Sequence, residues 1–160
     1  MDESLSVVEE PKAPIPMIPK GTLIPAILCD LDGTLALKTS DRSIYDWSRV
    51  GEDSVAPHVH KMLKVYFESL HFQIIYLTGR DEEAREKTEE WLNTHKCPPG
   101  PLIMRRKGDR RSSETVKAEL YAEHVLGKYS VEFVLEDWDK CVGMWRFLGL
   151  NCFQVSDGRF

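Results

Sequence analysis

The sequence predicts an α/β fold of three layers, with a mostly parallel five-stranded sheet and helices on both faces. Five short apolar runs, typical of buried strands, alternate along the chain with four longer segments of helical periodicity. Strands that alternate with helices form βαβ units with right-handed crossovers, which build parallel sheets. The 160 residues suit one domain, and the 42% apolar and 29% charged residues are globular values.

The first expected strand, residues 25–29, ends in two aspartates, Asp30 and Asp32. Residues i and i+2 of an extended segment point the same way, so both carboxylates can face one cleft. Gly33 lets the chain turn away close to that cleft. Ligands of open α/β sheets bind at the carboxyl ends of the strands, so this pair is the first candidate site for a hard cation and a reacting group.

The later elements continue the alternation. Residues from Leu35 to Ala56 have no clear period and are expected to form a loop or small flap over the cleft. The patterns then predict a helix from Pro57, a strand at 72–77, a helix capped by Asp81, a strand at 101–104, a helix capped by Ser112 or Ser113 that runs to Gly127, a strand at 131–135, a helix at about 139–148 and a strand at 151–155.

The N-terminal residues and the overall composition narrow the setting. Residues 1–22 are rich in proline, which predicts a flexible tail before a domain at 23–160. Neither a signal-peptide pattern nor an apolar run near the ~20 residues of a membrane span is present, so we expect a cytoplasmic protein without membrane contact. The net charge of −5 excludes a uniformly basic nucleic-acid coat, while a local basic patch stays open.

The expected strand ends bring four groups of polar residues to one edge of the sheet. The aspartates after the first strand are joined there by Thr78-Gly79-Arg80, by the basic run Arg105–Arg111 and by Glu136-Asp137. Each group alone has an ordinary explanation as a turn, a solvated loop or a helix cap. A calcium loop does not fit the first group, because its glycine should be the sixth residue and Gly33 is the fourth from Asp30.

The run Asp30-Leu31-Asp32-Gly33-Thr34 resembles the first motif of phosphatases of the haloacid dehalogenase (HAD) superfamily. Thr78 after a strand, Lys117 on a helix and Glu136-Asp137 after a strand match the other three motifs. The resemblance implies a Rossmann-like, HAD-like fold and Mg²⁺ as the cofactor. It also implies that a phosphate monoester is cleaved through an aspartyl-phosphate.

The same resemblance assigns roles to the matched residues. Asp30 would attack phosphorus, Asp32 would protonate the leaving oxygen and later activate water, and Lys117 would neutralise charge. Phosphoryl oxygens would be held by Thr78 and by backbone N–H groups, with Gly33, Thr34 and Gly79 as candidates. The metal would be bound by Asp30, Asp137 and the main-chain carbonyl of Asp32, with Glu136 positioning the metal shell or its waters.

A narrower resemblance, to the 3′-phosphatase domain of phage-type polynucleotide kinase-phosphatases, covers much of residues 25–160. It is carried by residues 30–37, 45–46, 108–117, 144–146 and the ending 152–160. It implies removal of terminal 3′-phosphates from DNA or RNA in nucleic-acid repair, with Arg42 and Arg80 contacting the substrate. The family tends to have Asp near Ser113 and an Asp-Asp pair in place of Glu136-Asp137. The 160 residues hold no phosphate-binding kinase loop, so a separate kinase or ligase is a further candidate partner.

Physical arguments support a large substrate. Neither gap between the expected elements has room for a cap domain of ~50 residues, so the cleft should be open to a polymer end. Arg110 and Arg111 of the basic run are candidate contacts for neighbouring phosphates, and Tyr45 or Trp47 for stacking on a terminal base. A phosphatase for nucleotides or other small esters, a phosphotransferase and a non-catalytic module that binds nucleic-acid ends remain alternatives. The oligomeric state stays open.

Overall fold

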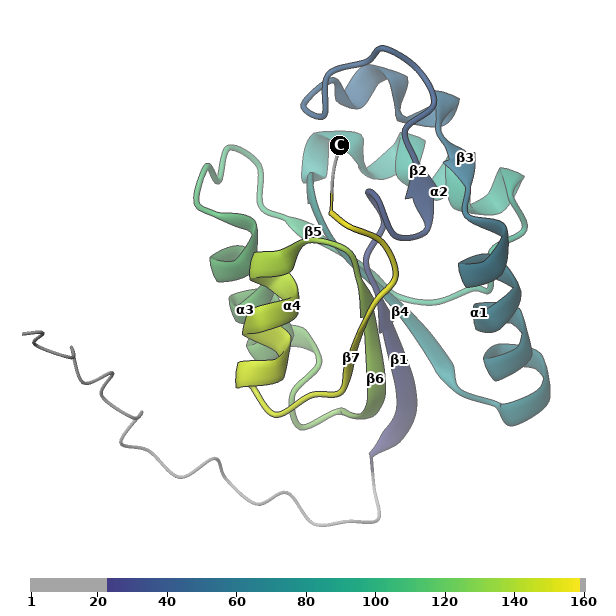
Figure 1. The fold of residues 1–160 in the computed structure, drawn as a ribbon, viewed down its shortest axis with the longest axis vertical. Helices are drawn as coiled ribbons and strands as arrows, with labels where there is room; N and C mark the ends of the chain where they lie inside the picture. The colour runs from purple at the N-terminus through teal and green to yellow at the C-terminus, as the bar shows by residue number, and fades with distance from the viewer. Residues whose placement is uncertain (1–22, 159–160) are drawn as a thin grey trace, which may run out of the picture.

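A computed structural model describes residues 23–158 of the chain, so the predicted tail at 1–22 lies outside the described residues. The main sheet has five strands, in the order β5 (Leu102–Arg105), β4 (Gln73–Asp81), β1 (Ile24–Cys29), β6 (Tyr129–Glu136) and β7 (Cys152–Gln154). All four neighbouring pairs are parallel. Because β1 is the central strand, the residues that follow it emerge at the middle of the sheet edge (Figure 1).

Helices cover both faces of the sheet, as the sequence predicted. On one face, α1 (Pro57–Leu70) and α2 (Arg85–Thr94) share a core with Ile27 and Cys29 of β1. On the other face, α3 (Ser113–His124) and α4 (Asp139–Phe147) share a core with Ala26 and Leu28. Successive residues of a strand point to opposite faces, so the continuous apolar run of β1 serves both cores. The predicted three-layer fold is confirmed.

The flap comprises residues 36–55. It holds β2 (Ala36–Leu37), the 3₁₀ helix η1 (Trp47–Glu52) and β3 (Ser54–Val55), and β2 pairs with β3 in antiparallel orientation. It stands over the carboxyl end of the sheet and packs beside α2 (Figure 1). The segment is shorter than the ~50 residues of an independent domain, so no large cap covers the sheet edge within residues 23–158.

Two boundaries differ from the prediction. Strand β4 continues through Thr78-Gly79-Arg80 to Asp81, because a register shift after Thr78 lets Asp81 pair with Arg105 of β5. The Asp81 carboxylate does accept the Glu83 amide, but it caps the short 3₁₀ helix η2 (Glu82–Ala84), which precedes α2. Turn-forming residues therefore do not end β4, because its neighbour β5 continues to pair with it.

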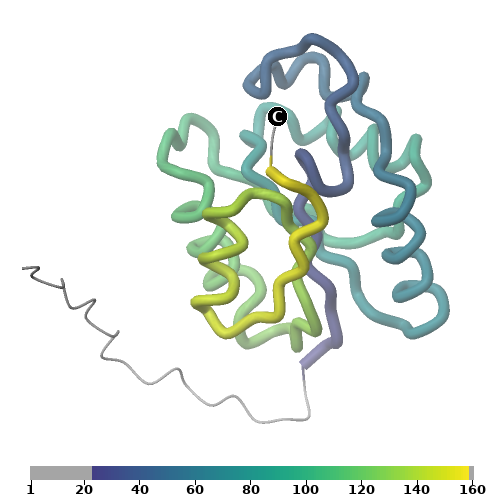
Figure 2. The backbone as a smooth tube through the Cα atoms, in the orientation of Figure 1, coloured from purple at the N-terminus to yellow at the C-terminus, as the bar shows by residue number. Residues whose placement is uncertain are grey.

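The segment after β7 runs back beside the loop that follows β1 (Figure 2). Its Ser156 hydroxyl donates to the Gly33 carbonyl at 3.2 Å, and Gln154 Nε2, at the end of β7, donates to the Asp137 carbonyl at 2.9 Å. Gly158 is buried against the Asp137 carbonyl, which would lie 2.6 Å from an added Cβ. This segment therefore ties together the loops that follow β1 and β6. None of the helices in the described part of the chain combines the length and apolar character that crossing a bilayer requires.

Candidate active site

A cleft of about 1050 Å³ opens at the carboxyl edge of the sheet. Its lining includes Asp30 and Asp32 after β1, Lys117 of α3, and Glu136 and Asp137 at the end of β6. The predicted convergence of strand ends therefore occurs. The cleft is also lined by flap residues and by the loop between β5 and α3, so segments far apart in sequence meet around it.

A tight turn shapes the loop after β1. Gly33 adopts φ +81°, a conformation that favours glycine, and its amide donates to the Ala36 carbonyl at 2.9 Å. The amides of Leu35 and Ala36 both donate to the Leu31 carbonyl, at 2.9 and 2.8 Å. The turn carries the chain away from the cleft immediately after Asp32 and leaves both aspartates at its edge.

Four residues, Asp30, Lys117, Glu136 and Asp137, form a buried group that we call the acidic corner. Lys117 Nζ donates to Asp30 Oδ1 and to Glu136 Oε2, each at 2.7 Å. No member is more than 5% exposed. With all groups ionised, three carboxylates face one ammonium, so the corner is short of positive charge.

The remaining oxygens of the acidic corner are not equally occupied. Thr34 Oγ1 lies 3.4 Å from Asp30 Oδ2 and 3.1 Å from Asp137 Oδ1, and it is almost fully buried between them. Glu136 is saturated, because Oε1 accepts the Asp137 and Trp138 amides and Oε2 also accepts Trp145 Nε1 at 3.3 Å. Asp137 Oδ2 is buried and has no partner among the described residues. A buried acceptor without a donor is costly, so this oxygen is suited to a cation.

The donor set fits magnesium. Asp30, Glu136 and Asp137 each offer a carboxylate oxygen, and these oxygens lie within 4.8 Å of one another. Mg²⁺ prefers one or two carboxylates and keeps several waters. Asp30 and Asp137 are therefore the side chains best placed to bind it, whereas the saturated Glu136 supports the site through Lys117. The side chain of Asp32 stands outside this group, in keeping with an expected contribution from its main-chain carbonyl alone.

Electrostatics shift the protonation of the corner. Burial, followed by the charge of Glu136, raises the pKa of Asp30 well above its ordinary value. The same two causes raise the pKa of Asp137 to about 6. Burial alone lowers the pKa of Lys117, but the charges of Asp30 and Glu136 outweigh it, and the lysine stays charged. A divalent cation would relieve the crowding of carboxylates and favour their ionised forms.

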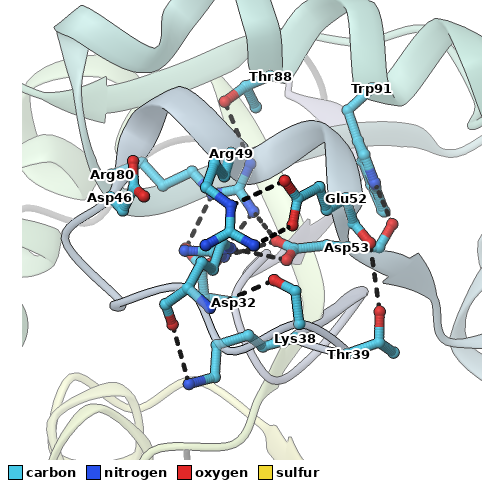
Figure 3. A network of polar contacts seen from close by, with 12 residues as sticks. Asp32, Lys38, Thr39, Asp46, Arg49, Glu52, Asp53, Arg80, Thr88 and Trp91 are labelled. Atoms are coloured by element: carbon cyan, nitrogen blue, oxygen red, sulfur yellow. Dashed lines mark hydrogen bonds and ion pairs between the residues drawn. The ribbon is translucent and has the colours of Figure 1, made fainter.

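A second group, the flap cluster, consists of Asp32, Arg42, Asp53 and Arg80. Arg80 donates to Asp32 through Nε at 2.9 Å and Nη2 at 2.8 Å, and to Asp53 through Nη2 at 3.1 Å (Figure 3). Arg42 donates to Asp53 through Nε at 2.8 Å and Nη2 at 2.6 Å, and to Asp32 at 3.3 Å. The group joins the ends of β1 and β4 to the flap.

Three side chains expected to contact substrate are buried, and of these Arg42 also lines the cleft. Arg80 and Thr78 are fully buried, and Arg42 is 2% exposed. The Thr78 hydroxyl accepts the Arg80 amide at 3.2 Å, and the guanidinium groups of both arginines are bound to carboxylates. Direct contact of Arg80 with substrate does not fit its burial, because none of its surface reaches the cleft. Its geometry gives it a role in holding Asp32.

The basic run between β5 and α3 is largely paired internally. Arg106 binds Glu123, Lys107 binds Glu83, and Arg111 binds both Asp109 and Glu119. Arg105 donates to the Gly79, Asp109 and Arg111 carbonyls and so shapes its own loop. Arg110 lines the cleft, is exposed, and has no ion pair within residues 23–158. It is therefore the cation of this run that is best placed for a phosphate.

The sequence reasoning missed Asp53 and Trp145. Asp53 is fully buried and binds both arginines of the flap cluster, and Trp145 donates to Glu136. Asp53 lies in a flap without periodicity, so no local pattern marked it. The acidic pair Glu52-Asp53 shortly before the apolar run Val55-Ala56 was the one available signal. Trp145 lies in the run 144–146 that carries the narrower resemblance, but no contact with Glu136 was expected of it.

The parallel sheet, the paired aspartates after its central strand and the lysine that bridges two carboxylates define a HAD-type phosphatase domain. The family comparison is more specific: residues 24–160 match the model of the polynucleotide kinase PNKP phosphatase domain, and the chain belongs to that family.

Relatives agree with this membership. A protein of Autographa californica nuclear polyhedrosis virus, described as a bifunctional polynucleotide kinase/RNA ligase, is 35% identical over 135 residues, or 82% of this chain and 19% of the viral protein. A chain in the structure of a Pnkp1/Rnl/Hen1 complex has TM-score 0.82 and 35% identity over 100% of this chain and 52% of that one. A chain of the Pnkp1/Rnl/Hen1 RNA repair complex has TM-score 0.84 and 36% sequence identity, and the match covers 96% of this chain and 49% of that one. The HAD domain of the Legionella pneumophila effector Lem4 shares only the fold. Its TM-score is 0.52 and its identity 12%, and the match covers 88% of this chain and 91% of that one.

Proposed function

We propose that this domain is a Mg²⁺-dependent polynucleotide 3′-phosphatase that acts through an aspartyl-phosphate on Asp30. The observation that carries this proposal is the acidic corner, where Lys117 holds Asp30 in place while the neighbouring Asp137 keeps an oxygen that has no partner among residues 23–158. A phosphate dianion repels an aspartate nucleophile, so positive charge must offset both. Lys117 supplies part of that charge, and bound Mg²⁺ would supply the rest by neutralising phosphoryl and carboxylate oxygens.

The reaction has two steps. In the first, an oxygen of Asp30 attacks phosphorus, the bond from phosphorus to the nucleic-acid oxygen breaks, and Asp32 gives that oxygen a proton. In the second, Asp32 takes a proton from water as the water oxygen attacks phosphorus. The bond between Asp30 and phosphorus then breaks, and inorganic phosphate leaves.

Three observations favour a nucleic-acid end over a small ester. The flap leaves the cleft open, Arg110 faces it without an ion pair in the described part of the chain, and Tyr45 lines it with 75% of its surface exposed. Of the two predicted stacking residues, Trp47 is partly buried. Tyr45 packs edge-on against it, with 6.4 Å between the ring centroids. The names of the relatives, which combine polynucleotide kinase with RNA ligase or RNA repair, support RNA ends and a companion ligase.

The test is a phosphate-release assay with Mg²⁺ on matched RNA and DNA oligonucleotides that end in a 3′-phosphate, a 5′-phosphate or a 2′,3′-cyclic phosphate. We expect the 3′-phosphorylated oligonucleotide to exceed a nucleoside 3′-monophosphate in kcat/KM. Equal or faster turnover of the mononucleotide would indicate a small-ester phosphatase. Tight oligonucleotide binding without phosphate release would contradict the catalytic proposal.

A further inference from the structure

Asp53 is a charged residue that the proposed chemistry does not use, although it lies at the centre of the flap cluster. Its side chain is fully buried and does not line the cleft, so it cannot touch substrate. Oδ1 accepts Arg42 Nε at 2.8 Å, while Oδ2 accepts Arg42 Nη2 at 2.6 Å and Arg80 Nη2 at 3.1 Å. Any effect of Asp53 on the reaction must therefore pass through the two arginines.

The hydrogen bonds at Asp32 show what the arginines do. Asp32 Oδ1 accepts from Nη2 of both arginines, while Oδ2 accepts, within the described part of the chain, only from Arg80 Nε. A carboxylate has about four acceptor sites, two on each oxygen. The cluster thus fills Oδ1 and leaves one site on Oδ2, on a side chain that is 29% exposed and lines the cleft.

Asp53 keeps that remaining site open. Each Nη2 group has two hydrogens, and in both arginines one goes to Asp32 and the other to Asp53. Two guanidinium groups are balanced by two carboxylates, and only Asp32 of these four side chains is appreciably exposed. Without the Asp53 charge, two buried cations would compete for Asp32 and occupy its free acceptor site.

Helix α2 holds this arrangement in place. Trp91 Nε1 donates to the Asp53 carbonyl at 2.8 Å, and Arg80 Nη1 donates to Thr88 Oγ1 at 3.2 Å. Figure 3 shows both contacts on one side of the cluster, with Asp32 on the other. The flap is therefore tied to helix α2 at Asp53 itself.

We propose that Asp53 is a positioning residue for proton transfer: it orients Arg42 and Arg80 so that Oδ2 of Asp32 is the oxygen that carries the proton to and from the cleft. This inference rests on the proposed role of Asp32 as general acid and base. Its signature is a dependence on the leaving group, because p-nitrophenolate departs readily without a proton and an alkoxide does not.

The experiment compares kcat/KM of Asp53→Asn and wild type, with Mg²⁺, on a 3′-phosphorylated oligonucleotide and on p-nitrophenyl phosphate. We expect a loss of about 100-fold on the oligonucleotide, within the range of general acid catalysis, and of at most about 5-fold on the aryl ester. Glu52→Gln, which removes the adjacent flap carboxylate, is the control and should change neither value. Equal losses of Asp53→Asn on both substrates, or no loss, would overturn the proposal.

Two further variants protect the test against misfolding. Trp91→Phe keeps an aromatic ring and removes the hydrogen bond to the Asp53 carbonyl. It should lower the ratio of kcat/KM on the oligonucleotide to kcat/KM on the aryl ester by about 3-fold, in the same direction as Asp53→Asn. In an Asp32→Asn background, Asp53→Asn should leave that ratio unchanged, because the effects of substituting two residues that act as a unit do not add. A ratio unmoved by Trp91→Phe, or moved in the double variant, contradicts the inference. A wild-type protein inactive on both substrates would instead contradict the proposed function.

Discussion

The acidic corner and the flap cluster flank the same cleft but differ in how their buried charges are balanced. In the flap cluster, the two carboxylates of Asp32 and Asp53 are matched by the guanidinium groups of Arg42 and Arg80. In the acidic corner, three carboxylates share one lysine, and one buried oxygen has no partner in the described chain. A balanced group needs nothing from outside, whereas an unbalanced one is completed by a cation.

The difference assigns separate tasks to the two groups. The corner holds the nucleophile and has an affinity for positive charge, so changes there should affect every phosphate ester alike. The cluster is electrically complete and acts by geometry, so changes there should depend on how much the leaving group needs a proton.

The largest effect is expected for Asp30→Asn. An amide cannot form the acyl phosphate, so kcat should fall by about 10⁴-fold or more on an oligonucleotide and on p-nitrophenyl phosphate alike. The fold should persist, because the variant removes one of three crowded carboxylates. Turnover is measured by phosphate release and folding by thermal unfolding. Retained activity on either ester would remove Asp30 from the role of nucleophile.

Lys117→Met should be the next most damaging change. Loss of the ammonium removes a positive group beside the nucleophile, which costs about 10²–10³-fold in kcat/KM on both esters. It also leaves the Asp30 and Glu136 carboxyls buried without a cation, which lowers the free energy of unfolding by about 3 kcal/mol. Urea unfolding and kinetics measure the two effects. Lys64→Met, which removes a surface lysine paired with Glu68, is the control and should be near neutral in both.

A smaller effect is expected from pH in the absence of metal. The pKa of Asp137 is raised to about 6, so the folded state holds a proton that the unfolded state has lost above pH ~4. The contribution of Asp137 to stability should therefore be greatest below pH ~4 and decline as the pH rises through about 6, which lowers Tm by roughly 2–5 °C. The raised pKa of Asp30 acts in the same direction.

Thermal unfolding in a chelator between pH 4.5 and 7.5 measures this decline. Mg²⁺ should raise Tm more at pH 7.5 than at pH 4.5, because the ionised carboxylates bind it. Asp137→Asn should flatten the pH dependence and weaken the response to Mg²⁺. A wild-type Tm that rises across this range would show that the corner is not crowded with negative charge.

Sequence reasoning succeeded where chemistry coincided with a strand end. Asp30, Asp32 and Asp137 follow buried apolar runs, so their convergence at one edge followed from the parallel sheet. Lys117 was placed by resemblance alone, because a lysine on a helix has no local mark of burial. The structure shows it 4% exposed between two carboxylates.

There is a physical reason why the contacts of Asp53 could not be predicted from the sequence. Its partners, Arg42 and Arg80, lie 11 and 27 residues away, and the contact forms only when the flap folds over β4. The extension of β4 through Thr78-Gly79-Arg80 escaped prediction for a related reason, since it depends on pairing with β5. Contacts set by tertiary neighbours leave no periodic signal in the chain.

The smallest effect tests substrate size at the edge of the cleft. Arg110→Ala removes an exposed cation that has no ion pair in residues 23–158. If it meets a phosphate beyond the reacting one, KM for a 3′-phosphorylated oligonucleotide should rise about 3–5-fold, the worth of one exposed charge contact. The dependence of log KM on log salt should weaken by about 0.7, as for one lost phosphate contact on a single strand. p-Nitrophenyl phosphate has no second phosphate, so its KM should not change.

Arg106→Ala is the matched control, because it removes the same charge from the same loop. Arg106 points to Glu123 at 2.7 Å and does not line the cleft, so its loss should leave both substrates unaffected. The same response from both variants would mean that net charge, and not a defined contact, attracts the oligonucleotide. An effect confined to Arg110→Ala would show that the open side of the cleft binds the nucleic-acid chain next to its terminal phosphate. That contact would be separate from the acidic corner and from the flap cluster.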